Sequence, residues 1–188
     1  MKPEVTPIID KLVKMPLEKL HIRYIPAVTP IELWNYDMSL KNSPHVELMK
    51  IFSKHGLRWD KIYESRYYKE RQHRFEIGMS RWHKRKISEH IIARYSIFKS
   101  IKKKGYDKNK DKINPVKVLK EPFWATRFNC REVWLNGYEI WNGAGRCAAA
   151  YVLGYSKLPV LLVKDPRPGT EDKGKFGSKL KDVRGVWL

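Results

Sequence analysis

The chain has 188 residues, of which 39 are Lys or Arg and 20 are Asp or Glu, so its formal net charge is +19 at pH 7. This excess of positive charge goes beyond what solubility requires and favours a polyanionic partner, namely nucleic acid. No segment reaches 18 consecutive apolar residues and the N-terminus lacks the apolar core of a signal peptide. We therefore expect a cytoplasmic protein without a membrane partner.

The two cysteines, Cys130 and Cys147, form neither a disulfide framework nor a metal-binding motif, and the six histidines do not fall at zinc spacing with them. We therefore expect no structural metal. The length suits one domain, or one domain with an appendage. Composition leaves the oligomeric state open.

Residues 1–86 are expected to form a mainly helical N-terminal extension with one strand, packed on the rest of the chain. Residues 1–20 are amphipathic and contain three prolines, which leaves room for a short helix at Ile8–Met15. Alternating apolar residues over Leu20–Ile25 predict a strand that Pro26 ends. A helix capped by Ser43 should begin at Pro44 and end before Gly56.

A longer helix is predicted over Trp59–Ile77, followed by a basic connector. Between Arg66 and Lys86 the chain has eight Lys or Arg and two Glu, with aromatic side chains interleaved. Cations beside aromatic rings suit phosphate contact and base stacking, although a solvated helix face can show the same charge run. The candidate nucleic-acid-binding residues are Arg66, Lys69, Arg71, Arg74, Arg81, Trp82, Lys84 and Arg85.

The next helix is predicted over Ile87–Lys104, with one apolar stripe and with Arg94 off that stripe. A strand follows near Val116. Residues 120–131 are rich in aromatic side chains and are either a packed insertion or a lid that stacks on a base.

The segment Trp134–Val163 organises the rest of the chain. Asn136-Gly137 predicts a tight hairpin between Glu132–Leu135 and Tyr138–Trp141. The second arm leads through a glycine-rich turn into an alanine-rich helix that Gly154 ends, and Val160–Val163 forms a buried strand. Such a turn lets backbone approach an anion closely and presents the N–H groups of a helix start. The turn consists of Asn142, Gly143, Ala144, Gly145 and Arg146.

Two blocks of the sequence resemble the ParB/sulfiredoxin superfamily. Residues 137–163, G-Y-E-I-W-N-G-A-G-R-C-A-A-A-Y-V-L-G-Y-S-K-L-P-V-L-L-V, are similar to the family's strand, Gly-x-x-Arg turn, short Ala-rich helix and Pro-led strand. Residues 94–106 and 114–118 are similar to its helix ending in Ser-Ile-x-x-x-Gly and the Pro-Val-x-Val strand that follows. The resemblance implies an α/β (α+β) fold with a small mixed sheet in residues 87–165, and leaves 166–188 as a flexible basic tail.

The resemblance also implies that the turn holds nucleotide phosphates and that the helix carrying Arg94 borders the same pocket, so that Arg94 either reaches a phosphate or, as we favour, faces solvent or DNA. Gly143 and Arg146 match the family motif. Ala144 stands where ParB has Glu and sulfiredoxin has its reactive Cys, and Gly145 stands where the family usually has Arg or His. Sulfiredoxin chemistry is therefore excluded.

Our first hypothesis is a ParB-like protein that binds DNA through the basic aromatic face and a nucleotide or backbone phosphate at the turn, and that processes or modifies DNA. Catalytic residues are not evident, because Glu132, Glu139 and Asp165 are not placed convincingly for phosphodiester chemistry. The alternative is a phosphotransferase or NTPase of the ParB-fold kinase type, which would use a nucleoside triphosphate with Mg²⁺. A further alternative is a non-catalytic inhibitor or adaptor that binds DNA or protein.

Overall fold

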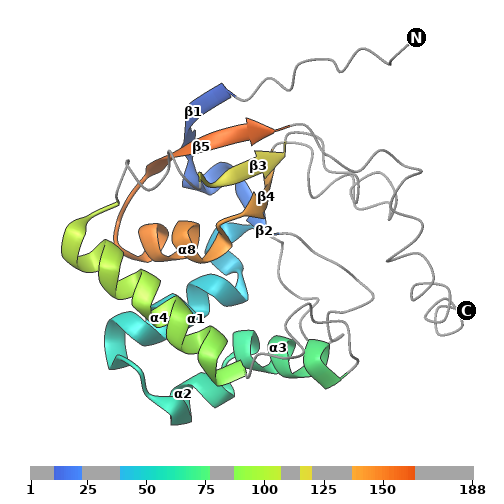
Figure 1. The fold of residues 1–188 in the computed structure, drawn as a ribbon, viewed down its shortest axis with the longest axis vertical. Helices are drawn as coiled ribbons and strands as arrows, with labels where there is room; N and C mark the ends of the chain where they lie inside the picture. Colours follow the sequence, from blue (N-terminus) through green and yellow to red (C-terminus); the bar gives the residue numbers. More distant parts are fainter. Residues whose placement is uncertain (1–10, 23–38, 77–86, 107–114, 120–136, 164–188) are drawn as a thin grey trace, which may run out of the picture.

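The computed structural model describes residues 11–22, 39–76, 87–106, 115–119 and 137–163. These residues form a mixed α/β fold, as the sequence predicts, in which one five-stranded sheet is covered by helices on one side (Figure 1). The predicted lid at 120–131 and the predicted tail at 166–188 lie outside the described residues.

The sheet has the order β1-β5-β3-β4-β2. Its antiparallel pairs are β1 with β5 and β3 with β4, and its parallel pairs are β3 with β5 and β2 with β4. The sheet is therefore mixed, and it draws strands from both ends of the described chain. The strands are β1 Lys11–Pro16, β2 Leu20–Ile22, β3 Lys117–Leu119, β4 Tyr138–Asn142 and β5 Lys157–Val163.

The sheet is strongly curled, because its two edge strands are close neighbours in sequence. β1 and β2 are separated by a single 3-10 turn, η1 Leu17–Lys19. A flat sheet of five strands spaced about 4.8 Å apart would hold its edges about 19 Å from each other. A three-residue 3-10 turn rises only about 6 Å. The two edges must therefore approach each other.

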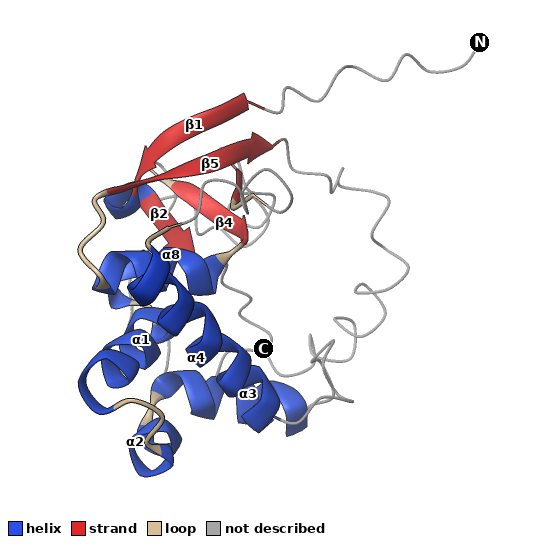
Figure 2. Ribbon diagram, turned by 60° about the vertical axis from the view of Figure 1, so that its left-hand side comes forward, coloured by secondary structure: helices blue, strands red, loops and turns tan. Residues whose placement is uncertain are grey.

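The helices lie in layers on one side of the sheet, with α8 nearest to it, α1 and α4 beyond, and α2 and α3 farthest away (Figures 1 and 2). The short 3-10 helix η4 Leu40–Asn42 leads into α1. The α-helices are α1 Pro44–His55, α2 Trp59–Glu64, α3 Arg66–Glu76, α4 Ile87–Lys104 and α8 Ala144–Val152.

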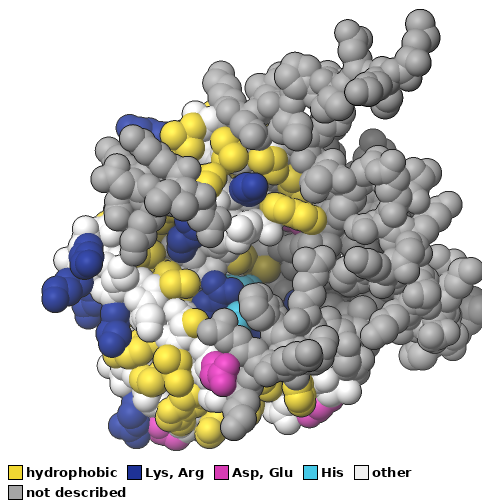
Figure 3. Space-filling view, viewed as in Figure 1, with side chains coloured by type: hydrophobic (Ala, Val, Ile, Leu, Met, Phe, Trp, Pro, Cys, Tyr) yellow, Lys and Arg dark blue, Asp and Glu magenta, His cyan; other side chains and the backbone are white. Residues whose placement is uncertain are grey.

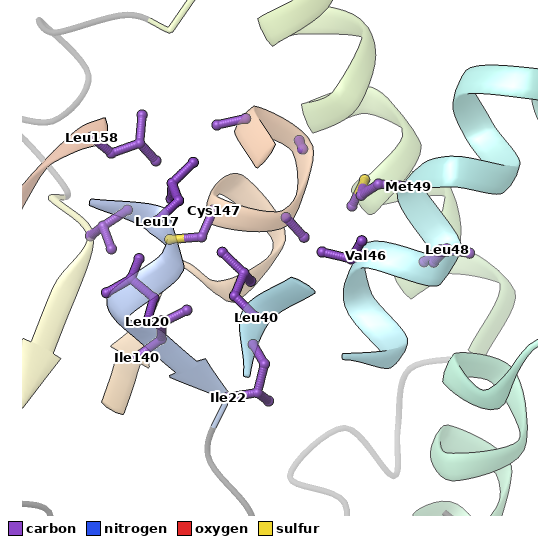
Figure 4. Packing of buried hydrophobic residues seen from close by; sticks show 14 of the residues in the cluster. Leu17, Leu20, Ile22, Leu40, Val46, Leu48, Met49, Ile140, Cys147 and Leu158 are labelled. Atoms are coloured by element: carbon purple, nitrogen blue, oxygen red, sulfur yellow. The ribbon is translucent and has the colours of Figure 1, made fainter. Parts of the chain in front are cut away.

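The core lies between the sheet and α8 and continues to α1. Ile140 of β4, Leu20 of β2 and Cys147 of α8 point into one cluster, which Leu40 and Val46 extend towards α1 (Figure 4). Three consecutive alanines of α8, residues 148–150, are fully buried. Because alanine has the smallest side chain that favours a helix, α8 can pack closely against its neighbours on several sides.

The predicted ends of α1 and α4 and the end of α8 before Gly154 are confirmed, whereas α8 begins at Ala144, so the last three residues of the predicted turn are its first helical residues. The Ser43 hydroxyl accepts a hydrogen bond from the N–H of Val46 at 3.3 Å, as an N-cap should. Gly56, Gly105 and Gly154 follow α1, α4 and α8 with positive φ angles of 68°, 75° and 86°. Glycine reaches this region without steric cost, so it ends helices well.

Two predictions for the N-terminal half are wrong in part. The helix expected at Ile8–Met15 is the strand β1 over the residues described there, because pairing with β5 outweighs local helical pattern. The helix expected over Trp59–Ile77 is divided at Ser65, whose ψ of 146° is extended. The Ser65 hydroxyl accepts from the N–H of Tyr68 at 3.2 Å, so this residue caps α3.

The predicted hairpin at Asn136-Gly137 does not match the strand pairing of the sheet. Its first arm, Glu132–Leu135, lies outside the described residues, and its second arm is β4. Both edges of β4 are occupied, by β2 on one side and β3 on the other. Gly137 also has no positive φ, which a type I′ turn would require. Long-range pairing has replaced the expected local one.

None of the described helices combines the length and the apolar character that crossing a bilayer would need.

Candidate functional site

The N-terminus of α8 is formed by the glycine-rich turn. Gly143 is the N-cap residue and has φ 100°, in the left-handed region. Its carbonyl accepts hydrogen bonds from the N–H groups of Arg146 at 2.9 Å and Cys147 at 3.0 Å, which close the first turn. Gly143 has no side chain to cap the first N–H groups, so these donors and the positive end of the helix dipole are directed at whatever lies before α8.

Two arginine side chains flank this first turn. A β-carbon built on Gly145 would lie 2.5 Å from Nη1 of Arg94, so the Arg94 side chain, from α4, occupies the space beside Gly145. A β-carbon built on Gly143 would lie 3.1 Å from Nη2 of Arg146. The structure therefore brings Arg94 to the predicted turn, although 52 positions separate it from Arg146 in sequence.

Arg94 also reaches Tyr67 of α3. The Tyr67 hydroxyl lies 2.8 Å from Nε2 of His90, and Arg71 lies over the Tyr67 ring with its guanidinium carbon 5.2 Å from the ring centre. Burial disfavours ionisation of this phenol. The positive charges of Arg71 and Arg94 and a hydrogen bond from Arg94 outweigh that effect, so the pKa of Tyr67 lies below its usual value.

His45 of α1 completes this group of polar side chains. It is buried, with its ring centre 5.0 Å from that of Tyr67 in an edge-to-face arrangement. Burial is the main reason why the pKa of His45 lies well below its usual value, and nearby positive groups lower it further. These groups are Arg71, Arg94, Arg74 and His90. His45 is therefore neutral at pH 7.

We call Arg71, Arg74 and Arg94, together with His45, Tyr67, Glu70 and His90, the inter-helix cluster. It joins α1, α3 and α4 and meets α8 through Arg94. On the face drawn in Figure 3, Lys or Arg atoms and His atoms lie next to each other near the centre. Because Arg94 lies beside Gly145 and also forms a hydrogen bond with Tyr67, the cluster and the turn are continuous.

The candidate DNA-binding residues of α3 have different surroundings. Arg66 pairs with Glu47 at 2.6 Å and donates to the carbonyl of Asn42 at 3.0 Å, so it ties α3 to α1. Arg74 pairs with Glu70, and both side chains are largely buried. Lys69 is exposed, and Arg71 faces inward over Tyr67. The remaining candidates, Arg81, Trp82, Lys84 and Arg85, lie outside the described residues.

Carboxylates do not gather at the turn in the part of the chain that the structure describes. Glu139 is fully buried on β4, and because side chains alternate along a strand it lies on the opposite face from its neighbour Ile140, which faces the helices. No group of three metal-binding side chains occurs among the described residues. Glu132 and Asp165 lie outside those residues.

Comparisons of the chain with models of protein families, with curated proteins and with solved structures find no match. The site must therefore be interpreted from its own residues.

Sequence reasoning did not identify His45, Tyr67 and His90 as parts of the site. A signal was present, because Tyr67 precedes Arg71 by four residues and His90 precedes Arg94 by four, so each pair shares a helix face. Nothing in the sequence indicated that these faces meet.

Proposed function

We propose that the chain binds a nucleotide or a nucleic-acid backbone phosphate at the N-terminus of α8, as ParB/sulfiredoxin-type proteins do, and that it also binds DNA. The observation that carries this proposal is the position of Arg94 against Gly145. Arg94 adds a second guanidinium group to that of Arg146 at the start of a helix that already presents N–H donors. Two guanidinium groups and a helix N-terminus suit a phosphate group.

The position of Arg94 also accounts for a departure from the family motif. The family usually carries Arg or His where this chain has Gly145. Here the absence of a side chain at Gly145 leaves room for the guanidinium of Arg94, which comes from α4. A cation is thus supplied to the turn from another helix. This substitution supports a phosphate-binding turn rather than a degenerate one.

The charge of the whole chain supports the nucleic-acid part of the proposal. A net charge of +19 gives non-specific affinity for a polyanion through counterion release. Arg66 and Arg74 are paired with carboxylates of the protein, so we assign DNA contact on α3 to Lys69 and leave the two paired arginines out. Binding, without a reaction, is what we propose, because the described carboxylate of β4, Glu139, faces away from the helices.

Thermal unfolding in the presence of ligands tests the nucleotide part. We would compare ATP, CTP and GTP, each with and without Mg²⁺, on the wild type, Arg146→Ala and the control Lys103→Ala. Lys103 is exposed near the end of α4, so its removal changes the net charge equally. A ligand at 100 times its dissociation constant adds about 2.7 kcal/mol to the free energy of unfolding. We expect a shift that Arg146→Ala loses and Lys103→Ala keeps.

Titration of a labelled DNA duplex at increasing salt tests the second part. Each phosphate neutralised contributes a slope of about −0.9 in log affinity against log salt. We expect a negative slope that becomes shallower by about 1 unit in Lys69→Gln if this lysine contacts one phosphate. If the chain binds DNA and no nucleotide, the nucleotide proposal is wrong and the adaptor alternative remains. If it binds neither, the proposed function is refuted.

A further inference from the structure

One hydroxyl group of α3 binds two side chains of α4. The Tyr67 hydroxyl lies 2.8 Å from Nε2 of His90 and accepts a hydrogen bond from Arg94. His90 and Arg94 are four residues apart, so they lie on one face of α4 and one turn from each other. Because a guanidinium group can only donate, the Tyr67 oxygen accepts from Arg94, and its own O–H remains able to donate to His90.

The Tyr67 side chain is itself fixed by its neighbours. It is 1% exposed, and the ring of His45 meets it edge to face with the ring centres 5.0 Å apart. The ring of His90 lies parallel to it, with the centres 6.2 Å apart and an interplanar angle of 6°. A buried ring packed in this way changes rotamer only if its neighbours move. The Tyr67 hydroxyl is therefore held at one position.

Arg94 reaches the turn over Gly145, which leaves space for it and has no side chain to bind it. A β-carbon on Gly145 would lie 2.5 Å from Nη1, 3.0 Å from Cδ and 3.2 Å from Cζ of Arg94, so the end of this side chain lies along the first turn of α8. Nε of Arg94 has no hydrogen-bond partner among the described residues, so the bond to Tyr67 comes from a terminal nitrogen. That bond fixes the orientation of the guanidinium group at the turn.

A fixed arginine binds an anion more tightly than a mobile one. A free arginine side chain has many rotamers, and a ligand that selects one of them loses binding free energy as side-chain entropy. The hydrogen bond to Tyr67 removes much of this freedom before the ligand arrives. Tyr67 belongs to α3 and would thus affect a ligand at α8 through Arg94.

We propose that Tyr67 is a positioning residue, whose hydroxyl holds the guanidinium group of Arg94 in place for a phosphate group at the N-terminus of α8. This inference rests on the function proposed above, because it takes that N-terminus as the phosphate site. It gives the buried contact between α3 and α4 a role in ligand binding. A hydroxyl with a purely structural role would not change the affinity in a way that depends on Arg94.

Isothermal titration with tripolyphosphate tests the inference, because this probe carries the linked phosphate groups of a nucleotide without its base. Tyr67→Phe removes the hydroxyl and keeps the ring. We expect it to weaken binding by about three- to tenfold, which is the effect of releasing one side chain. Tyr63→Phe, which removes a hydroxyl from an exposed ring of α2, should bind as the wild type does. The melting temperature without ligand shows whether each variant is folded.

Combining two variants measures whether Tyr67 acts through Arg94. In an Arg94→Ala background, Tyr67→Phe should cause no further loss of affinity, because no guanidinium group is left to hold. Equal losses in both backgrounds would mean that the hydroxyl acts through packing, and would overturn the inference. The same cycle with ATP and with a DNA duplex identifies the source of the phosphate, since the ligand that Arg94 contacts should show the same coupling.

Arg94→Lys provides a test that does not depend on the folding of Tyr67→Phe. Lysine keeps the charge but lacks the rigid group that donates to Tyr67 and to the ligand at once, so it should lose at least as much affinity as Tyr67→Phe. Full affinity in Arg94→Lys would overturn the inference.

Arg146→Ala separates the inference from the function on which it rests. If Arg146→Ala weakens the binding of tripolyphosphate and folded Tyr67→Phe does not, the positioning role is refuted and the phosphate site at α8 stands. If tripolyphosphate does not bind the wild type, both proposals are wrong.

Discussion

Nη1 of Arg94 lies 2.5 Å from the point at which a side chain on Gly145 would begin. Contacts this short do not occur for a real β-carbon, so the position of Arg94 depends on the absence of a side chain at Gly145. Gly145 and Arg94 are therefore coupled, although they belong to two different helices, α8 and α4.

Gly145→Ala should weaken phosphate binding without unfolding the protein. The new methyl group would displace Arg94, and the loss of a charged hydrogen bond costs about tenfold or more in affinity. Alanine is favoured over glycine in a helix by about 1 kcal/mol, so the free energy of unfolding should stay within about that amount of the wild type. Isothermal titration with tripolyphosphate and urea denaturation measure the two effects.

A double-mutant cycle shows whether Arg94 is the cause. In an Arg94→Ala background, Gly145→Ala should produce no further loss of affinity, because the displaced side chain is already absent. Equal losses in both backgrounds would mean that Gly145→Ala acts directly on the ligand or on the backbone of the turn.

Arg66→Gln should lower stability and leave ligand binding unchanged. The variant loses a 2.6 Å ion pair with Glu47 and a hydrogen bond to the carbonyl of Asn42, which together fasten α3 to α1. Because the side chain is 37% exposed, solvent screens the pair, and we expect a loss of about 1 kcal/mol in urea denaturation. Lys103→Gln, which removes an exposed charge of α4, is the control for charge. A weaker affinity for tripolyphosphate in folded Arg66→Gln would contradict this assignment.

Ser65→Ala should destabilise the start of α3 by about 1 kcal/mol. The hydroxyl of Ser65 accepts from the N–H of Tyr68 and donates to the carbonyl of Ile62 at 2.6 Å, and the side chain is buried. The variant leaves these partners without their bonds. Ser65→Thr keeps the hydroxyl and should recover most of the loss in thermal unfolding. Equal losses in both variants would show that packing, and not capping, is responsible.

Stability should fall on acidification below about pH 6.5, and His45 should cause part of that fall. The pKa of His45 is lowered in the folded state, so the unfolded chain binds its proton first as the pH decreases. The contribution is absent above about pH 6.5 and reaches at most about 1.4 kcal/mol per pH unit below it, until the folded-state pKa is reached.

Urea denaturation between pH 5 and pH 7.5 measures this slope in the wild type and in His45→Gln. The slope should be smaller in His45→Gln. His55→Gln, at an exposed position of the same helix, should retain the slope of the wild type. The same slope in all three proteins would show that His45 is not the group responsible.

Local signals predicted the helix ends well, and long-range pairing accounts for what they missed. Ser43, Gly56 and Gly154 act through backbone atoms within a few residues, so their effect is readable from sequence. β1 depends on β5, whose position the first residues cannot reveal. The hairpin expected at Asn136-Gly137 failed for the same reason, since both edges of β4 are taken by β2 and β3.

The candidate site likewise has a part that local sequence signals predicted and a part that depends on tertiary packing. The turn from Gly143 to Arg146 was identified from local chemistry, and the placement of Arg94 beside it came from resemblance alone. Ser65 shows why α3 was misread. A serine inside a basic amphipathic run gives little indication that the helix restarts there and directs Arg71 inward. Composition indicates how much charge a helix carries, and tertiary packing decides which way it faces.

The pairing of β1 with β5 joins Lys11 to Leu162, nearly the full span of the described chain. Contacts so distant in sequence require a large loop to close, which slows folding. During synthesis β1 cannot pair with β5 until almost all of the described chain has emerged from the ribosome. Truncation within β5 would therefore remove the partner of β1 and one of the two partners of β3, and a nascent chain that stops before Lys157 cannot complete the sheet.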